Sequence, residues 1–268
     1  MPLVILIISL IFLPGCQKEA QYDLHRGTYL TFNEMIDKLT TADIIIIGEL
    51  HNNQRHHENQ LRIIKAIHQR HPSIAIGLEM FPAESQKILD DWLGGRISDN
   101  EFIKHYYRVW AMPWPLYRDI FFFAKENQIP LLGLNVPERI AREIAKKGFQ
   151  ALSTDVKRSL PVSSCPVDEQ YMDFIRRALK MHKKGVDFQY FCEAQKIRDI
   201  VMAHNAVNYL RSHPGEKMLI LAGGGHAWRP GLPREIEKVS DYRVLVLLNC
   251  NGQDCSDVTA SEADFLMW

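Results

Sequence analysis

Polar residues that can bind or transfer protons stand directly after four apolar segments of this chain. Each segment is a short run rich in Ile, Leu or Val, which is typical of a buried strand. The residues after the runs 44–47, 74–78, 131–134 and 219–222 are Glu49 with His51, Glu79, Asn135 and, beyond three glycines, His226. Ligands of open parallel sheets bind beside the carboxyl ends of the strands. The sequence therefore predicts that these side chains meet in one site at one edge of a sheet.

The spacing of Glu49 and His51 suits shared chemistry. Residues i and i+2 of an extended chain project to the same side, so the pair could share a proton or a divalent metal ion. The plainer alternatives are that Glu79 caps the following helix and that His226 is a polar surface residue. The expected pocket consists of Glu49, His51, His57, Glu79, Asn135, Arg139 and His226. For His57, and for its neighbour His56, a solvated position on the helix is the alternative.

Several familiar sites are absent from the sequence. Gly223–Gly225 allow a close backbone approach and expose amides to an anion, but the Lys and Ser/Thr of a phosphate-binding loop are missing. The triplet also lacks the third glycine at helical spacing that a dinucleotide site needs. No His-Glu-x-x-His and no Gly-x-Ser-x-Gly occur, which argues against zincins and serine hydrolases. We therefore expect no nucleotide site.

The second informative region is the aromatic segment 105–117, which contains three tyrosines, two tryptophans and two prolines. A loop interrupted by proline cannot bury all of these rings in one helix core. Such a loop can offer a flat apolar surface to a planar ligand or to a partner subunit. It can equally form a satellite core beneath the sheet, and the sequence does not choose between the two.

The order of elements predicts how these residues are positioned. Strands separated by helical segments indicate an α/β fold with a mostly parallel central sheet flanked by helices. We expect strands near 44–48, 74–79, 130–134, 217–222 and 242–248. Helices are expected near 53–70, 84–93, 99–108, 116–127, from 137, and near 168–184, 187–212 and 231–238. The region 148–214 has no strand pattern, so we interpret it as a helical cap inserted between the third and fourth of these strands.

Length and charge limit the class of protein. The 268 residues suit one large α/β domain or two small ones. The 32 basic residues balance 32 acidic ones, so the composition gives no support for nucleic-acid binding. We expect a single domain over 28–250, followed by a C-terminal tail over 251–268.

The N-terminus resembles a bacterial lipoprotein signal. The apolar stretch 3–13 is shorter than the roughly 20 residues of a transmembrane helix and fits an export signal. It ends in Leu-Pro-Gly-Cys16, which resembles the lipobox whose cysteine is acylated, and Gln17 favours the outer membrane. We expect a signal peptide over 1–15, lipidation at Cys16, a tether over 16–27 and an outer-membrane location facing the periplasm. A buried N-terminal strand is the alternative, and the absence of Lys or Arg before the apolar stretch favours a start codon further upstream.

Four further cysteines remain. In an oxidising compartment an even number permits disulfides. Cys250 and Cys255 flank the turn dipeptide Asn-Gly, so a bridge between them is plausible. No second closely spaced pair supports zinc, and the pairing of Cys165 and Cys192 stays open.

Taken together, the motifs resemble those of the ChaN-type haem-binding lipoproteins, in the superfamily that includes erythromycin esterase, Tiki and TraB proteins. The resemblance extends from about residue 40 to 235. It is carried by Gly48–His51, His56-His57 with Gln60, Gly77–Phe81, Leu134–Pro137, Ala194-Gln195 with Asp199 and Met202-Ala203, and Ala222–His226. The superfamily shares the Glu-x-His and Gly-x-x-His elements, and several of its members are hydrolases, some of them metal-dependent.

The resemblance implies a haem carrier or receptor in bacterial iron uptake, with haem held non-covalently at a homodimer interface and delivered with an outer-membrane receptor. Ferric iron accepts a tyrosine phenolate or a histidine, and the propionates need basic partners. The aromatic segment offers Tyr117, Tyr107, Tyr106, His105 and Arg118, together with Lys104 and Arg108. We favour Tyr117 as the ligand, because it begins a helix after the Trp-rich loop and could point outward. No Cys-x-x-Cys-His motif for covalent haem is present.

Two functions of different classes remain from the sequence. The first is the haem-binding lipoprotein. The second is a hydrolase, either metal-dependent or using acid–base chemistry at Glu49, His51, Glu79 and His226.

Overall fold

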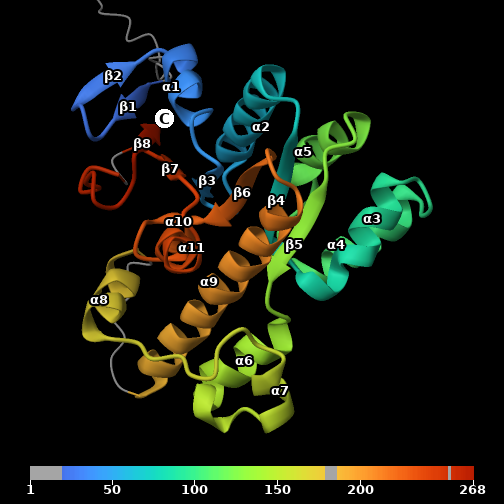
Figure 1. The fold of residues 1–268 in the computed structure, drawn as a ribbon, viewed down its shortest axis with the longest axis vertical. Helices are drawn as coiled ribbons and strands as arrows, with labels where there is room; N and C mark the ends of the chain where they lie inside the picture. Colours follow the sequence, from blue (N-terminus) through green and yellow to red (C-terminus); the bar gives the residue numbers. More distant parts are fainter. Residues whose placement is uncertain (1–19, 179–185, 253–254) are drawn as a thin grey trace, which may run out of the picture.

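A computed structural model describes residues 20–178, 186–252 and 255–268 of the chain (Figure 1). Its centre is an eight-stranded sheet with the order β2-β1-β8-β7-β3-β6-β4-β5. Strands β3 to β8 are mutually parallel, and only β1 runs antiparallel to its neighbours β2 and β8. The strands are β1 (Gln21–Asp23), β2 (Thr28–Leu30), β3 (Ile44–Glu49), β4 (Ile74–Pro82), β5 (Leu131–Asn135), β6 (Lys217–Gly223), β7 (Val244–Asn249) and β8 (Phe265–Met267). The predicted α/β fold with a mostly parallel sheet is confirmed.

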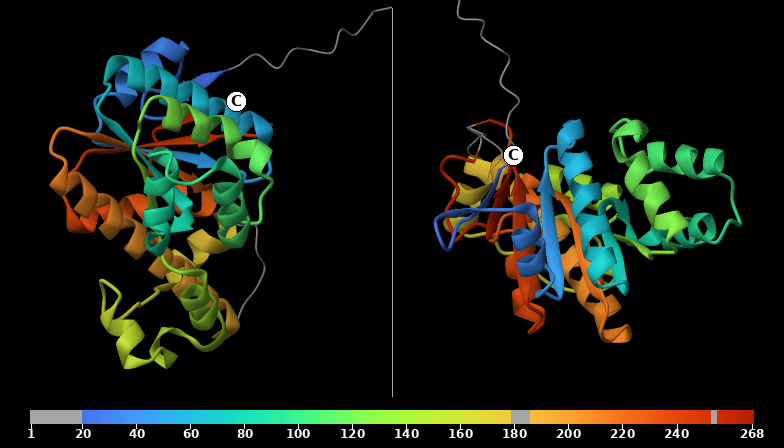
Figure 2. Two further views of the ribbon diagram at one scale, coloured as in Figure 1. Left: turned by 90° about the vertical axis from the view of Figure 1, so that its right-hand side faces the viewer. Right: turned by 90° about the horizontal axis from the view of Figure 1, so that it is seen from above.

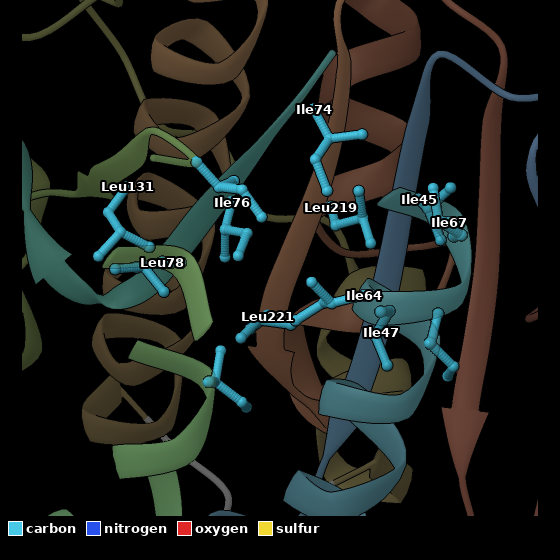
Figure 3. Close-up of a cluster of buried hydrophobic side chains, with 14 of the residues drawn as sticks. Ile45, Ile47, Ile64, Ile67, Ile74, Ile76, Leu78, Leu131, Leu219 and Leu221 are labelled. Atoms are coloured by element: carbon cyan, nitrogen blue, oxygen red, sulfur yellow. The ribbon is translucent and has the colours of Figure 1, made fainter. Parts of the chain in front are cut away.

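Alternating side chains of the strands build a core on each face of the sheet. On β3, Ile45 and Ile47 join one cluster, whereas Ile44 and Ile46 join the other. The first face is covered by α1 (Phe32–Leu39), α2 (Gln54–Arg70), α4 (Asp99–Val109) and α5 (Trp114–Glu126). Figure 3 shows Ile64 and Ile67 of α2 against this face. The second face is covered by α9 (Val186–Ser212), α10 (Gly224–Ala227) and α11 (Leu232–Val239).

Local signals position the helix starts as the sequence predicts. Asn53 caps α2 by accepting from the backbone N–H of His56. The expected capping box of Ser98 and Glu101 is present at the start of α4. The remaining helices are η1 (Ala83–Ser85), α3 (Gln86–Leu93), α6 (Glu138–Lys147), η2 (Phe149–Ala151), α7 (Thr154–Arg158) and α8 (Glu169–Ala178).

The ends of the chain differ from the expected tether and tail. Gln21–Asp23 forms a strand of the sheet between β2 and β8, so the domain begins by residue 20 and not at 28. Phe265–Met267 is a buried strand beside β7, so the segment after 250 belongs to the domain. The physical reason is that β1 and β8 pair with each other. Without β8, β1 would pair only with β2, and without β1, β8 would pair only with β7. The backbone N–H of Trp268 donates to the carbonyl of Ala20 at 3.0 Å.

Only part of the region 148–214 forms the helical cap that the sequence predicted. The second half of α9 packs Met202, Ala206 and Leu210 on the sheet, so it is a face-covering helix of the core. The segments α6, η2 and α7 form a separate cluster with the first half of α9. Figures 1 and 2 show α6 and α7 extending beyond the carboxyl end of β5, away from the β1–β2 hairpin.

Cys250 and Cys255 form the disulfide that the sequence made plausible, while Cys165 and Cys192 are free and buried. Within the described residues, no helix is both long and apolar enough to cross a bilayer. The signal peptide, Cys16 and Gln17 lie outside the described residues.

Candidate functional site

A cavity of about 870 Å³ opens at the carboxyl edge of the sheet. Its floor is formed by the ends of β3, β4 and β6, and its walls come from the α4–α5 connection and from α6, α8 and α9. Glu49, His51, Glu79, Asn135, Arg139 and His226 all line it. The structure therefore brings together the strand-end residues that the sequence pointed to.

Glu49 is the centre of the first polar cluster, which we call the Glu49 cluster and which contains His51, His57 and Tyr117. The carboxylate is buried, and its Oε1 lies 2.8 Å from Nδ1 of His51. Its Oε2 lies 3.1 Å from Nδ1 of His57. The Tyr117 hydroxyl donates a hydrogen bond to Oε1. The solvated position considered for His57 is therefore wrong, because its ring is buried between Glu49 and Gln60.

The charges of this cluster support one another. Burial alone would raise the pKa of the Glu49 carboxyl, but the hydrogen bonds and charges of His51 and His57 outweigh it and lower that pKa to about 2. Burial opposes protonation of His51, yet its bond to Glu49 and the charge of Glu79 raise its pKa. Glu49 is thus an ionised carboxylate that favours protonated histidines.

A second polar cluster has a similar composition, and we call it the Asp199 cluster, with His226 and Tyr171. Asp199 lies on α9 and is fully buried; its Oδ1 is 2.7 Å from Nδ1 of His226. The Tyr171 hydroxyl of α8 donates to Oδ2 at 2.9 Å. Here burial raises the pKa of the Asp199 carboxyl, and His226, Lys196 and Tyr171 offset only part of that effect. The alternative of a polar surface residue is wrong for His226, which is only 8% exposed.

Glu79 lies between the two clusters. Its Oε1 is 3.5 Å from Nε2 of His226, and its Oε2 accepts from the backbone N–H of Gly223 at 2.5 Å. A Cβ on Gly223 would lie 2.6 Å from the His51 ring, so glycine lets that ring reach the floor. Two histidines, each oriented by a carboxylate at Nδ1, therefore flank a third carboxylate. That arrangement is suited to proton transfer.

Asn135 and Arg139 have different roles in the cavity. The Asn135 side chain donates to the carbonyl of Glu79 at 2.8 Å and accepts from the N–H of Val136. It therefore fixes the backbone between β4 and β5. Arg139 lies at the rim, exposed and 3.7 Å from Glu84. Arg108, Arg142 and Arg198 also line the cavity, and Arg142 and Arg198 both pair with Glu138.

The aromatic segment resolves into buried and exposed residues. The expectation that Tyr117 points outward is wrong, because its ring is fully buried and its hydroxyl is bound to Glu49. Tyr106 is buried too, and its hydroxyl donates to the Met112 carbonyl at 3.0 Å. These rings are the satellite core that the sequence left open. Tyr107 is different: it is 52% exposed and lines the cavity.

The other two residues expected near haem are outside the cavity lining. His105 contacts Ser85 through Nε2 at 2.9 Å. Burial and the charge of Arg108 lower its pKa. Arg118 is exposed on α5 and pairs with its neighbour Asp119 at 2.8 Å. His105 lies on α4 and Arg118 on α5, and neither side chain lines the cavity.

The sequence did not identify three residues of the candidate site, namely Tyr171, Trp110 and Asp199. Trp110 packs edge-on against His51 with ring centroids 4.8 Å apart. Asp199 and Tyr171 lie on helices, where no strand pattern identifies a site. The only sequence signal for Asp199 was its place among the motifs that resemble the ChaN-type family. Among the described residues, no group of three or more His, Cys, Asp or Glu side chains is arranged to hold a metal ion.

A family model described as haem-binding uptake, Tiki superfamily, ChaN, matches residues 35–236. The chain belongs to this family. The matched range includes Glu49, Glu79 and His226, which line the cavity, and Asp199, which is buried behind His226. No curated protein matches the chain.

Two solved structures resemble the fold. A structure described as cofacial haem binding to ChaN of Campylobacter jejuni is 22% identical, with a TM-score of 0.71, and the match covers 94% of this chain and 97% of that one. A mutant of the erythromycin esterase EreC in its open conformation is 14% identical, with a TM-score of 0.53 over 85% of this chain and 76% of that one. At such identities the likeness establishes the shared fold.

Proposed function

We propose that this ChaN-family protein binds haem non-covalently in the cavity at the carboxyl edge of its sheet. In this proposal it is anchored through acylated Cys16 to the outer membrane, faces the periplasm and serves haem or iron uptake with an outer-membrane receptor. Family membership supports the class of ligand. The observation that carries the site is the exposed Tyr107 at a cavity whose rim holds four arginines.

The residues present fit haem. A cavity of about 870 Å³ is within the range of cofactor pockets. Its walls combine apolar side chains, including Leu50, Val109 and Ile175, with the cationic rim. Guanidinium groups are suited to the two propionates, since they pair bidentately with carboxylates. Iron bound there supplies a Lewis-acidic centre that accepts an anionic oxygen ligand.

Tyr107 replaces Tyr117 as the favoured iron ligand. The backbone N–H of Trp114 donates to the Tyr107 hydroxyl oxygen at 3.0 Å, which fixes that oxygen against the start of α5 and leaves its own proton free to be lost to iron binding. Tyr106 and Tyr117 have their hydroxyls engaged inside the protein. Tyr107 is therefore the one tyrosine of the segment 105–117 with an exposed ring.

A homodimer with haem between its subunits completes this proposal. Of the three large hydrophobic side chains that are exposed among the described residues, Leu50 and Tyr107 line the cavity. A second copy placed over the mouth would cover both side chains and the exposed face of the porphyrin. The solved ChaN structure, with its cofacial haems, supports this arrangement as a hypothesis for the present chain.

A haem titration of the chain from Gln17 onward tests the proposal. Saturable binding, a phenolate-type ferric absorption band and a shift from monomer to dimer in sedimentation are expected. Tyr107→Phe should abolish the phenolate band and weaken binding about tenfold or more. Tyr29→Phe, also at an exposed tyrosine, is the matched control and should leave both unchanged. An intact band in Tyr107→Phe would overturn the ligand assignment, and the absence of saturable binding would overturn the function.

A second candidate function rests on the two carboxylate–histidine pairs at the cavity floor. Glu49 orients His51 and Asp199 orients His226, so one histidine can accept a proton from water while the other donates to a leaving group. This acid–base hydrolysis needs no metal ion. A panel of ester and lactone substrates tests it: turnover by the wild type that falls at least a hundredfold in His226→Gln would support it. No turnover by the wild type would remove the candidate.

A further inference from the structure

We propose that the β1–β2 hairpin, residues 21–30, is a membrane-contact surface that rests on the lipid bilayer next to the anchor. This inference rests on the acylation of Cys16 proposed above. It goes further, because it assigns a binding surface and an orientation to the anchored protein. The partner is the headgroup layer of a phospholipid membrane.

The first argument is the short reach of the chain. Only three residues separate Cys16 from Ala20, so the two Cα atoms are at most about 14 Å apart in a fully extended chain. Ala20 is fixed by its bond to Trp268, and Gln21 pairs with Leu30 on β2. An acyl chain on Cys16 would therefore hold the hairpin close to the bilayer and raise its effective concentration there.

The second argument is the chemistry of the hairpin. Tyr29 is 71% exposed, more than any other large hydrophobic side chain that the structure describes. It lies opposite Tyr22 across the two strands, with the rings in edge contact at 5.1 Å. Tyrosine is enriched at membrane interfaces, where its ring enters the apolar layer and its hydroxyl stays in water.

The turn of the hairpin adds positive charge. The Arg26 side chain is 69% exposed and lies 4.0 Å from Asp23. The His25 side chain is 54% exposed, but its Nε2 lies 2.8 Å from Oδ1 of Asp264, so the charge that the turn presents is mainly that of Arg26. Asp23 itself is buried and also neutralised by Lys38 at 3.3 Å. Exposed basic side chains next to an aromatic ring attract anionic phospholipids. The hairpin thus presents both kinds of side chain that a lipid surface binds.

Acidic side chains around the hairpin are already engaged. Glu34 accepts from Thr31 in a capping box, and Asp37 pairs with Arg70 at 2.9 Å. Asp264 is buried and bound by Arg229 at 2.7 Å. They therefore oppose the attraction of the turn only weakly.

This contact would leave the cavity free. Strands β8 and β7 separate β1 from β3, so the cavity floor lies several strands away from the hairpin. Figures 1 and 2 show the hairpin and the α6–α7 segment at opposite ends of the molecule. With the hairpin on the membrane, the mouth stays open to haem and to a second copy of the chain.

Site-specific fluorescence on vesicles tests the surface. Thr28→Cys places an environment-sensitive probe on the hairpin, and Asp155→Cys places the same probe on α7; Cys165 and Cys192 are buried and do not compete for the label. The acylated protein is reconstituted in phosphatidylethanolamine–phosphatidylglycerol vesicles that contain nitroxide lipids. We expect at least twofold quenching at position 28 and none at 155. Adding Tyr29→Ser should reduce the quenching at 28 by half or more.

This design tests the acylation of Cys16 and the membrane contact of the hairpin independently. Mass spectrometry of the wild type and of Cys16→Ser reports acylation by itself. If Cys16 is not acylated, the chain from Gln17 with an N-terminal hexahistidine on nickel-chelating lipids repeats the quenching test with the same tether. Equal quenching at 28 and 155 on either vesicle would overturn the proposal. So would cross-linking of position 28 to a second copy of the chain, because the edge strand would then be covered by protein.

Discussion

The Glu49 cluster and the Asp199 cluster use the same three groups, but their carboxyl pKa values shift in opposite directions. In each, a buried carboxylate accepts a tyrosine hydroxyl and holds Nδ1 of a histidine. Glu49 has a second histidine, His57, within 3.1 Å, and its pKa falls to about 2. Asp199 has one histidine, and burial raises its pKa. In the Glu49 cluster the hydrogen bonds and charges of the partners outweigh burial, whereas in the Asp199 cluster burial outweighs His226, Lys196 and Tyr171.

The largest expected effect is a difference in the free energy of unfolding between variants of Glu49 and of Asp199. Glu49→Gln leaves the buried His57 and the partly exposed His51 without their counter-charge, so we expect the free energy of unfolding to fall by about 3 kcal/mol. Asp199→Asn keeps one acceptor oxygen for His226, its amide N–H can donate to the Tyr171 hydroxyl oxygen, and the ionised form that burial disfavours is no longer possible, so a loss of about 1 kcal/mol is expected. Urea unfolding of both variants at pH 6 measures the difference. Equal losses would contradict the opposite shifts of the two carboxyl pKa values.

The comparison also explains what the sequence could predict. Glu49, Glu79 and Asn135 were found because parallel strands deliver their carboxyl ends to one edge, and His226 because glycines follow β6 directly. The strand pattern, and with it the fold class, depends on local periodicity.

Asp199 and Tyr171 reach the site through the docking of α8 and α9, which are separated from β3 by more than 100 residues. Local periodicity does not encode how such helices pack. The outward direction expected for Tyr117 failed for a different reason. Trp114, Tyr117, Phe121 and Ala124 are all buried at spacings of three and four, so they form the inner stripe of α5. The sequence predicted a helix only from about residue 116, so Trp114 was assigned to the preceding loop and the inward direction of Tyr117 was not recognised.

A smaller effect is the pH dependence of the two clusters. The pKa of Glu49 is 4.5 in its usual state and about 2 in the fold, so its stabilisation is present above pH 4.5 and is lost as the pH falls toward 2. The pKa of Asp199 is raised above 3.8, so folding favours its protonated form and its contribution to stability grows as the pH falls. The histidines have raised pKa values, and their contributions are present below pH 6.5 and decline as the pH rises through those raised values.

Urea unfolding from pH 5.5 to pH 3 tests these signs. The difference in unfolding free energy between the wild type and Glu49→Gln should shrink by about 2 kcal/mol over that range. The difference between the wild type and Asp199→Asn should stay constant or grow. Parallel pH profiles for the two variants would show that the carboxylates do not differ in charge.

The smallest expected effect concerns the two tyrosine hydroxyls. Tyr117→Phe and Tyr171→Phe each delete one buried hydrogen bond and keep the ring, so each should cost about 1 kcal/mol of unfolding free energy. Their effects on the carboxylates should differ, because Glu49 keeps two histidines whereas Asp199 keeps one. We therefore expect Tyr171→Phe to raise the pKa of Asp199 further, while Glu49 stays ionised in Tyr117→Phe.

Carboxyl-carbon NMR titration of the two variants measures both pKa values directly. If Tyr117→Phe brings the pKa of Glu49 back to 4.5 or above, the tyrosine hydroxyl and not the histidine pair holds its charge. In that case the contrast between the clusters would come from tyrosine geometry. The Glu49 carboxylate would then need its tyrosine as much as the Asp199 carboxyl does.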